Sequence, residues 1–223
     1  MTTLAPQSIL LLGNSPKFAE LMAALYPHAQ RTIVSWRMLG DPQAQQVMTR
    51  APYDLIVICG YDYHSAMYAY QRYWNANVLA VMNALQPDID QQVPMIYIDT
   101  LDSGKSATYS RYVFAKKSLA DQLQRSGAKV AILPVPTLTN ADGQLAIHGG
   151  WMTRQLFGLM HKLGLVQTMN PITLQTAVQS AYGTLLHPSS KTTSPKQTGL
   201  LRGMGLSIPR PLLFDRALRI ICG

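Results

Sequence analysis

The stretch SILLLGNSPKFAELM (residues 8–22) combines a short apolar run, a glycine turn and a helical pattern. Residues 8–12 are apolar enough for a buried strand, and Gly13 ends the run. After Pro16, apolar residues return at Phe18, Leu21 and Met22, which is the spacing of one helix face. The stretch therefore predicts a strand, a tight turn and a helix, in that order.

The same alternation continues through the first 135 residues. Further strands are expected at residues 32–36 (TIVSW), 55–59 (LIVIC), 94–98 (PMIYI) and 129–133 (KVAIL). Helical spacing is found in between, at residues 68–85 and 110–126. Buried strands that alternate with helices predict an α/β fold, a Rossmann-like doubly wound parallel sheet in three layers.

The chain is predicted to divide at residue 187. Residues 1–186 are expected to form the α/β domain, with a loop-like stretch at 134–150 and helices at 151–163 and 170–186. Residues 187–223 are expected to be a flexible, basic C-terminal tail, because HPSSKTTSPKQTG (187–199) has almost nothing to bury. The last residues, PRPLLFDRALRIICG, have the pattern of a short amphipathic helix.

Composition excludes several classes of protein. The net charge of +8 comes largely from the tail, which carries six basic residues against one acidic residue. No basic groove for nucleic acid is therefore expected in the domain, and no nucleic-acid partner. The two cysteines, Cys59 and Cys222, lack the spacing of a zinc site or a disulfide scaffold, so no metal is expected. We expect a reduced, cytoplasmic protein, since the N-terminus has no basic region before its apolar run.

The turn after the first expected strand is a candidate anion site. Free N–H groups at a helix start favour phosphate, so Gly13, Ser15 and Lys17 are candidate cofactor-binding residues. Pro16 and Ala19 stand where the dinucleotide fingerprint has glycines, which leaves a structural turn without ligand as the alternative.

Arg37 follows the second expected strand. A basic residue at this place can accept a 2′-phosphate, which favours NADP over NAD. The alternative is a solvated arginine at the end of a strand. NADP or NAD is thus the expected cofactor, if a dinucleotide binds.

Tyr112 and Lys116 form a Y-x-x-x-K pair in the helix expected at 110–126. Side chains four residues apart share one helix face, so the phenol and the ammonium are expected to be neighbours. A nearby positive charge lowers the pKa of a tyrosine, which suits the phenol to general acid/base catalysis. The pair alone is a weak signal, because this composition produces such spacings by chance.

The order of these pieces resembles the short-chain dehydrogenase/reductase superfamily. The resemblance rests on Gly13 after the first strand, WNANVLAVMNAL (74–85), IYIDT (96–100), the Tyr112–Lys116 pair and KVAILPVP (129–136). The branch that it resembles most is the NAD(P)-dependent epimerase/dehydratase group. The glycine turn is degenerate, and the region after residue 136 is short for a substrate-binding portion of that group.

The resemblance implies a role for individual residues. Tyr112 would be the catalytic acid/base, Lys116 would bind the nicotinamide ribose and tune the tyrosine, and Thr100 would polarise the substrate, with Ser103 or Ser106 as substitutes. Asn77 would support a proton-relay water. By the same resemblance, Cys59 and Gly60 would border the cofactor. The resembled family has a motif of small residues at this place, whereas here Cys59-Gly60 is followed by Tyr61 and Asp62.

Two functions are therefore open at the level of sequence. The first is an NADP-preferring epimerase, dehydratase or reductase, acting on a small molecule such as a nucleotide-linked sugar, as a homodimer of the kind usual in the resembled family. The second is a catalytically silent scaffold whose tail, residues 187–223, binds a partner protein or the inner face of an anionic membrane. The tail faintly resembles the entry segment of polyprenyl-phosphate sugar transferases, which suggests surface-polysaccharide biosynthesis.

Overall fold

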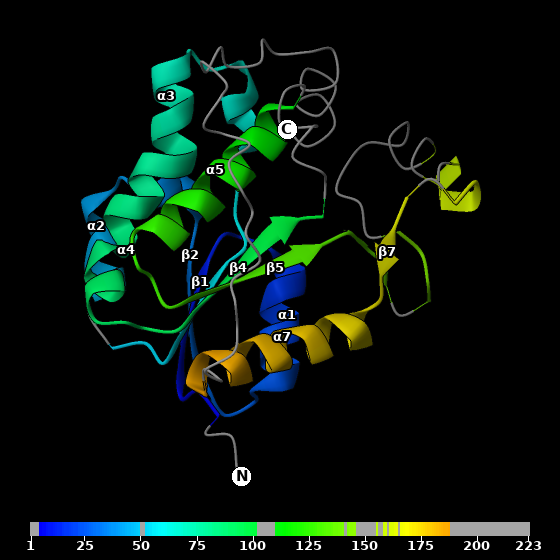
Figure 1. Ribbon diagram of the computed structural model, residues 1–223, viewed down its shortest axis with the longest axis horizontal. Coiled ribbons are helices and arrows are strands. Elements are labelled where there is room, and N and C mark those ends of the chain that lie inside the picture. Colours follow the sequence, from blue (N-terminus) through cyan, green and yellow to red (C-terminus); the bar gives the residue numbers. More distant parts are fainter. Residues whose placement is uncertain are drawn as a thin grey trace.

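A computed structural model describes residues 5–49, 52–101, 110–140, 142–145, 155, 158–159, 161–164 and 166–187. Five parallel strands form the central sheet, in the order β2-β1-β3-β4-β5 (Figure 1). The strands are β1 (Ser8–Leu12), β2 (Gln30–Val34), β3 (Leu55–Ile58), β4 (Met95–Thr100) and β5 (Val130–Val135). All five lie where the sequence predicts strands, with ends that differ by one or two residues.

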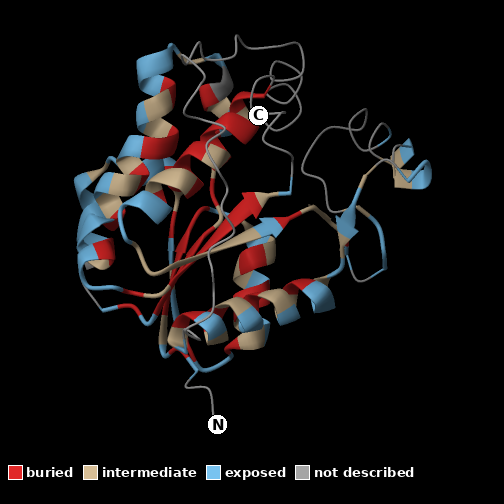
Figure 2. Ribbon diagram, viewed as in Figure 1, coloured by how far each residue is buried: buried red, intermediate tan, exposed pale blue. Residues whose placement is uncertain are grey.

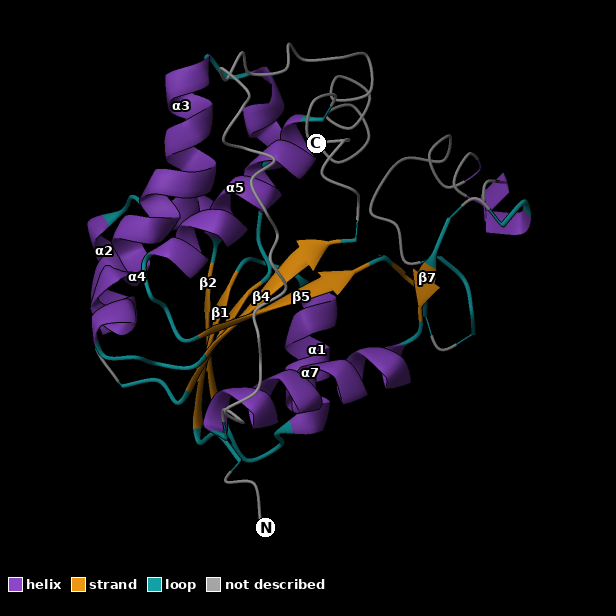
Figure 3. Cartoon of the chain, in the orientation of Figure 1, coloured by secondary structure: helices purple, strands orange, loops and turns teal. Residues whose placement is uncertain are grey.

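Helices cover both faces of this sheet (Figure 3). On one face lie α1 (Pro16–Leu25) and α7 (Pro171–Leu186), which pack together against it. The other face is covered by α2 (Pro42–Thr49), α4 (Ala80–Asp90) and α5 (Arg111–Arg125). The predicted doubly wound, three-layer α/β architecture is confirmed.

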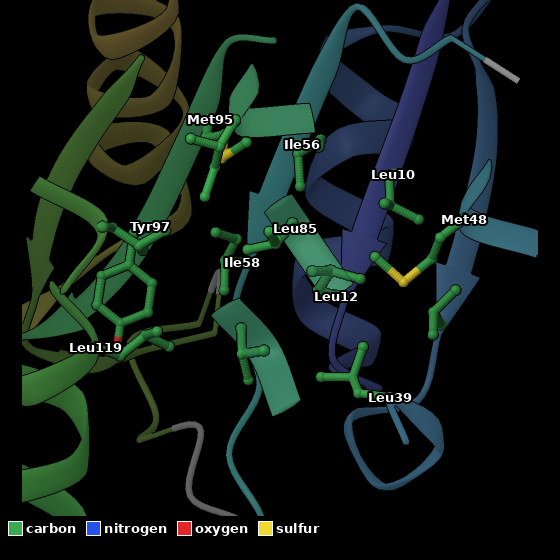
Figure 4. Packing of buried hydrophobic residues seen from close by; sticks show 14 of the residues in the cluster. Leu10, Leu12, Leu39, Met48, Ile56, Ile58, Leu85, Met95, Tyr97 and Leu119 are labelled. Carbon is green, nitrogen blue, oxygen red and sulfur yellow. The ribbon is translucent and has the colours of Figure 1, made fainter. Parts of the chain in front are cut away.

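Successive side chains along each strand point to opposite faces of the sheet, and they form two apolar cores. Leu10, Leu12, Ile56 and Ile58 point into the core beneath α4 and α5, where Leu85 and Tyr97 also pack (Figure 4). Their neighbours along the same strands point to the opposite core. Because both faces of β1 and β3 are covered, the two strands are continuous apolar runs rather than alternating ones. Figure 2 shows the result, with burial concentrated in the strands and on the helix sides that face them.

The segment between β3 and β4 is more irregular than predicted. In place of a single helix from residue 68, the chain forms η2 (Tyr63–Met67), α3 (Tyr70–Trp74) and η3 (Asn75–Leu79) before α4. The stretch η3 has the wider π-helical hydrogen bonding, which often marks a functional position. Asn77 lies in this stretch.

The segment expected to be a loop after residue 134 contains regular structure. β5 continues to Val135, and β6 (Thr137–Leu138) pairs in parallel with β7 (Thr168–Met169) to form a small second sheet. The loop prediction is wrong here, because a two-residue strand carries no periodicity and its partner is distant in sequence. The short 3₁₀ helix η1 (Trp36–Met38) follows β2 at the edge of the sheet.

Most of the helix expected at 151–163 lies outside the described residues, as does the tail beyond residue 187. None of the helices in the described ranges is both long and apolar enough to cross a membrane.

Candidate functional site

The candidate site lies at the carboxyl ends of the strands, where the chain changes sides of the sheet. After β1 the chain enters α1 on one face, whereas after β3 it enters the helices of the other face. Open α/β sheets bind ligands at such a switch point. The residues that follow β1 and β3 are Gly13 and the Cys59-Gly60 pair.

Gly13 and Gly60 meet backbone to backbone. A Cβ atom on Gly13 would lie 2.5 Å from the Gly60 Cα, and the Gly13 φ of +123° belongs to a region that other residues rarely adopt. The Cys59 amide donates to the Leu12 carbonyl oxygen at 2.9 Å, which continues the pairing of the two strands. Gly13, Cys59 and Gly60, three of the predicted cofactor-binding residues, therefore lie together, and the two glycines are required by the protein's own packing.

Trp36 covers Gly60 from the side of β2. A Cβ atom on Gly60 would lie 2.1 Å from the Trp36 ring carbon Cε3. The indole is almost fully buried, and its Nε1–H donates to the Ala76 carbonyl oxygen in η3 at 3.1 Å. Trp36 therefore fills the space over Gly60. Sequence reasoning missed this role, although a large aromatic residue just after a strand was the available signal.

The N-terminus of α1 faces the same edge of the sheet. Ser15 is its N-cap residue, and the Ser15 side chain makes no capping hydrogen bond. The first turn contains no acidic residue and begins with Pro16. Lys17 follows at once, with its Nζ donating to the Asn140 Oδ1 atom at 2.7 Å. The arrangement is favourable for an anion at the helix start.

Arg37 follows Trp36 in η1 and is paired with a carboxylate. Its Nε atom is 3.2 Å from the Asp62 Oδ1 atom. The arginine side chain remains more than half exposed, whereas the aspartate is almost fully buried. The sequence interpretation did not include this pairing.

Lys116 is buried on α5 and points toward β4. Its Nζ donates to the Ile98 carbonyl oxygen at 3.0 Å and lies 5.0 Å from the centre of the Tyr97 ring. Burial lowers the pKa of Lys116 to about 8, against the opposing influence of Cys59 and Asp99. Cys59 is thus close to this ammonium as well as to the glycine contact. Burial raises the pKa of its thiol to about 12.

Tyr112 is enclosed by two other tyrosines. Its ring packs edge-on against Tyr61, with centroids 4.9 Å apart, and stacks on Tyr63 at 6.0 Å. Burial, followed by the proximity of Tyr63 and Asp99, raises the pKa of Tyr112 well above its ordinary value. The sequence predicted the opposite direction, because it considered only Lys116.

Thr100 ends β4, beside a carboxylate that sequence reasoning missed. The Asp99 Oδ2 atom lies 2.6 Å from the Lys117 Nζ, and the same ammonium donates to the Thr100 carbonyl oxygen at 2.9 Å. The Thr100 amide donates to the Asp99 Oδ1 atom. A charged residue at the end of a buried strand was the signal available in the sequence. Ser103 and Ser106 lie outside the described residues.

Asn77 is buried and fully engaged with its neighbours. Its Nδ2 atom donates to the Ser65 Oγ atom at 2.7 Å and to the Tyr73 carbonyl oxygen at 3.1 Å. Its Oδ1 atom accepts the Asp62 amide at 3.0 Å. In this structure the asparagine therefore holds the loop after β3 against the π-helical stretch.

These positions follow the carboxyl ends of the strands. The α1 N-terminus with Ser15 and Lys17 offers N–H groups and a positive charge to phosphates. At the other end, Lys116 and Tyr112 face the ends of β3 and β4. Arg37 lies on the β2 side, where a ribose would be recognised. The Trp36 indole narrows that side.

Comparison with known proteins supports the fold. No protein-family model and no curated protein matches this sequence. Solved structures do match it, although at low identity. The dTDP-4-dehydrorhamnose reductase of Bacillus anthracis, solved in complex with NADP, superposes with a TM-score of 0.58 and 13% identity over 83% of this chain and 74% of its own. The GalE-like L-threonine dehydrogenase of Cupriavidus necator, in its holo form, gives a TM-score of 0.55 and 14% identity over 83% and 75%.

The chain has the fold of the NAD(P)-dependent epimerase/dehydratase group. A third match is the ADP-L-glycero-D-manno-heptose-6-epimerase of Helicobacter pylori, with a TM-score of 0.51 and 12% identity over 63% of this chain. The chain spans only 58% of that epimerase's length. Over the described residues, the sheet of the present protein has the order 2-1-3-4-5, without the outermost strand beside β2 that the six-stranded dinucleotide-binding order, 3-2-1-4-5-6, contains.

Proposed function

We propose that this protein is a nicotinamide-dependent reductase or epimerase of a nucleotide-linked sugar. The observation that carries the proposal is the position of α5, which brings Lys116 to the end of β4 and Tyr112 to the tyrosines that follow β3, while Thr100 is the last residue of β4. Lys116 reaches β4 through its hydrogen bond to Ile98, and Tyr112 lies one helical turn away on α5. Two tyrosines that follow β3 pack on Tyr112. A phenol, an ammonium and a hydroxyl are the groups that carbonyl–alcohol chemistry needs.

Named residues would hold each part of the cofactor. Ser15, Lys17 and the free amides of α1 would bind the pyrophosphate, and Arg37 would face the adenosine ribose. Lys116 would bind the nicotinamide ribose. When bound, the reduced nicotinamide supplies a hydride to the substrate's carbonyl carbon.

The charge state of Tyr112 favours the direction of reduction. Because burial raises its pKa, the phenol is protonated at neutral pH and can donate its proton to the carbonyl oxygen. Proton donation there, together with the hydride, converts the carbonyl into an alcohol. Thr100 would polarise the same oxygen, and the Lys116 ammonium, whose pKa is about 8, is largely charged at neutral pH.

The substrate class is supported by the nature of the structural matches. Two of them act on nucleotide-linked sugars according to their names, a heptose epimerase and a dehydrorhamnose reductase. A role in surface-polysaccharide biosynthesis, in a cytoplasmic enzyme that forms a homodimer, would be consistent with such a substrate. The carboxyl edge of the sheet is the place where that substrate would meet Tyr112.

Binding of the dinucleotide is the first test. Saturable binding of NADP(H) or NAD(H) at micromolar concentration, by calorimetry or by a rise in melting temperature, is expected. Turnover of a panel of nucleotide-linked keto sugars is then expected to fall about 10²–10⁴-fold in Tyr112→Phe, because a positioned acid/base contributes that much. Tyr70→Phe, at an exposed tyrosine of α3, is the matched control and should keep full turnover. An active Tyr112→Phe protein would contradict the proposal.

A second candidate function is a catalytically silent scaffold. It is favoured by Trp36, which fills the space over Gly60, and by the packing of Tyr61 and Tyr63 against Tyr112. In this function the domain would present the basic tail to a partner protein or to a membrane surface. The same experiment distinguishes the two, because the scaffold predicts no binding of either dinucleotide at millimolar concentration by a folded protein.

A further inference from the structure

The pair formed by Arg37 and Asp62 stands where the cofactor's ribose would be recognised. Arg37 lies in η1, directly after β2, and its Nε atom is 3.2 Å from the Asp62 Oδ1 atom. The arginine side chain is 58% exposed, whereas the Asp62 side chain is 6% exposed. A buried carboxylate therefore faces an arginine whose side chain is more than half exposed to solvent.

Asp62 is held in place by several hydrogen bonds. Its amide donates to the Asn77 Oδ1 atom at 3.0 Å, and its Oδ1 atom also accepts the His64 amide at 3.1 Å. Its carbonyl oxygen accepts from both the amide and the hydroxyl of Ser65. The His64 amide and Arg37 therefore hold the carboxylate itself, whereas Asn77 and Ser65 hold the backbone that carries it.

We infer that Asp62 offsets the charge of Arg37 and thereby sets the protein's selectivity between NADP and NAD. This inference rests on the proposed function, because it concerns the same cofactor site. A 2′-phosphate is attracted by the guanidinium but repelled by the fixed carboxylate behind it, so the pair presents little net charge to it. The 2′-hydroxyl of NAD carries no charge and is indifferent to this balance. The arginine alone therefore does not make the site selective for NADP.

The test removes the negative charge and keeps the hydrogen bond. Asp62→Asn retains an Oδ1 acceptor for the His64 amide, and the dissociation constants of NADP⁺ and NAD⁺ are measured by calorimetry for the full chain. We expect NADP⁺ to bind about two- to fivefold more tightly in Asp62→Asn, the usual scale for one charge pair, with NAD⁺ unchanged. Asp121→Asn is the matched control. It removes the carboxylate paired with Arg125 on α5 and should change neither constant.

A second variant keeps the inference testable if the Asp62→Asn substitution disturbs the loop after β3. Arg37→Gln leaves all the bonds of Asp62 to Asn77, His64 and Ser65 in place, and it should weaken NADP⁺ about threefold or more without affecting NAD⁺. An unchanged ratio of the two constants in both variants, or weaker NADP⁺ binding in a folded Asp62→Asn protein, would overturn the inference alone. Failure of wild type and variants to bind either dinucleotide would overturn the proposed function and the inference with it.

Discussion

Lys116 is a positive charge inside the protein, and its titration should be visible in stability. Its pKa is about 8 in the folded protein and 10.5 ordinarily, so between these values the unfolded chain binds more protons. The cost of the buried charge is therefore present below pH 8 and is relieved as the pH rises toward 10.5. The unfolding free energy of wild type minus that of Lys116→Met should increase by about 2 kcal/mol from pH 7 to pH 10.

Urea unfolding of the two proteins at each pH measures this difference. The subtraction matters because Cys59, whose pKa is raised to about 12, lowers stability over part of the same range in both proteins. A difference that stays flat with pH would show that Lys116 reaches water in the folded state.

Residue-level chemistry was only partly predictable from the sequence. The spacing of Tyr112 and Lys116 places both on one helix, and the structure confirms that helix. The direction of the Tyr112 pKa was not predictable, because Tyr61 and Tyr63 come about fifty residues earlier in the chain and reach it only through the fold. A separation of 25 residues in sequence likewise hid the contact between Arg37 and Asp62.

At the scale of elements, the contact between the β1 turn, the β3 turn and η1 can be tested by adding one methyl group. Gly60→Ala would push a Cβ atom to 2.1 Å from the Trp36 ring. We expect Gly60→Ala to lower the unfolding free energy by about 1–3 kcal/mol, as overpacking does. In a Trp36→Leu background most of that cost should disappear, giving a coupling of about 0.5–3 kcal/mol in a double-mutant cycle followed by urea unfolding.

Gly13→Ala is the control for this cycle. Its Cβ atom would meet the Gly60 backbone, and its φ is strained for alanine, so Trp36→Leu should not relieve it. Equal relief of both glycine variants would mean that Trp36 does not specifically fill the space over Gly60.

Elements with a strong period were predictable, and elements held by distant partners were not. The residues at 9–12 and 55–59 are all apolar, so both strands were predicted within a residue. Two-residue strands such as β6 carry no period, and β7 lies about thirty residues later. The π-helical stretch at Asn77 left no signal either, because its amide network depends on the loop after β3.

At the scale of the whole molecule, alternation of strands and helices fixes the layers but not the order of the strands. Five buried strands with crossover helices predict a parallel sheet. The sequence does not say whether another strand pairs with the outer side of β2. In the described sheet none does: the chain passes from β2 through η1 and α2 to β3, which pairs with the other side of β1. The edge position of β2 explains why Arg31 and Ile33 are exposed, whereas β1 and β3 are almost entirely buried.

The described domain should unfold as one cooperative unit, although its two cores lie on opposite faces of the sheet. Leu174 of α7 belongs to the core shared with α1, whereas Trp36 belongs to the opposite core. Leu174→Ala should cost about 2–5 kcal/mol through the cavity it leaves. Ile172→Ala, on the same helix but 74% exposed, should cost less than about 0.5 kcal/mol.

Two spectroscopic probes show whether the stability lost in Leu174→Ala is lost on both faces of the sheet. In a Trp151→Phe background, the tryptophan fluorescence comes from Trp36 and Trp74, both remote from α7 in the sheet's layering. Because β1 and β3 contribute side chains to both cores, the Leu174→Ala substitution should lower the urea midpoints of fluorescence and of far-UV circular dichroism equally. If the dichroism were lost at lower urea than the fluorescence, α1 and α7 would form a separate unit that unfolds before the face carrying Trp36.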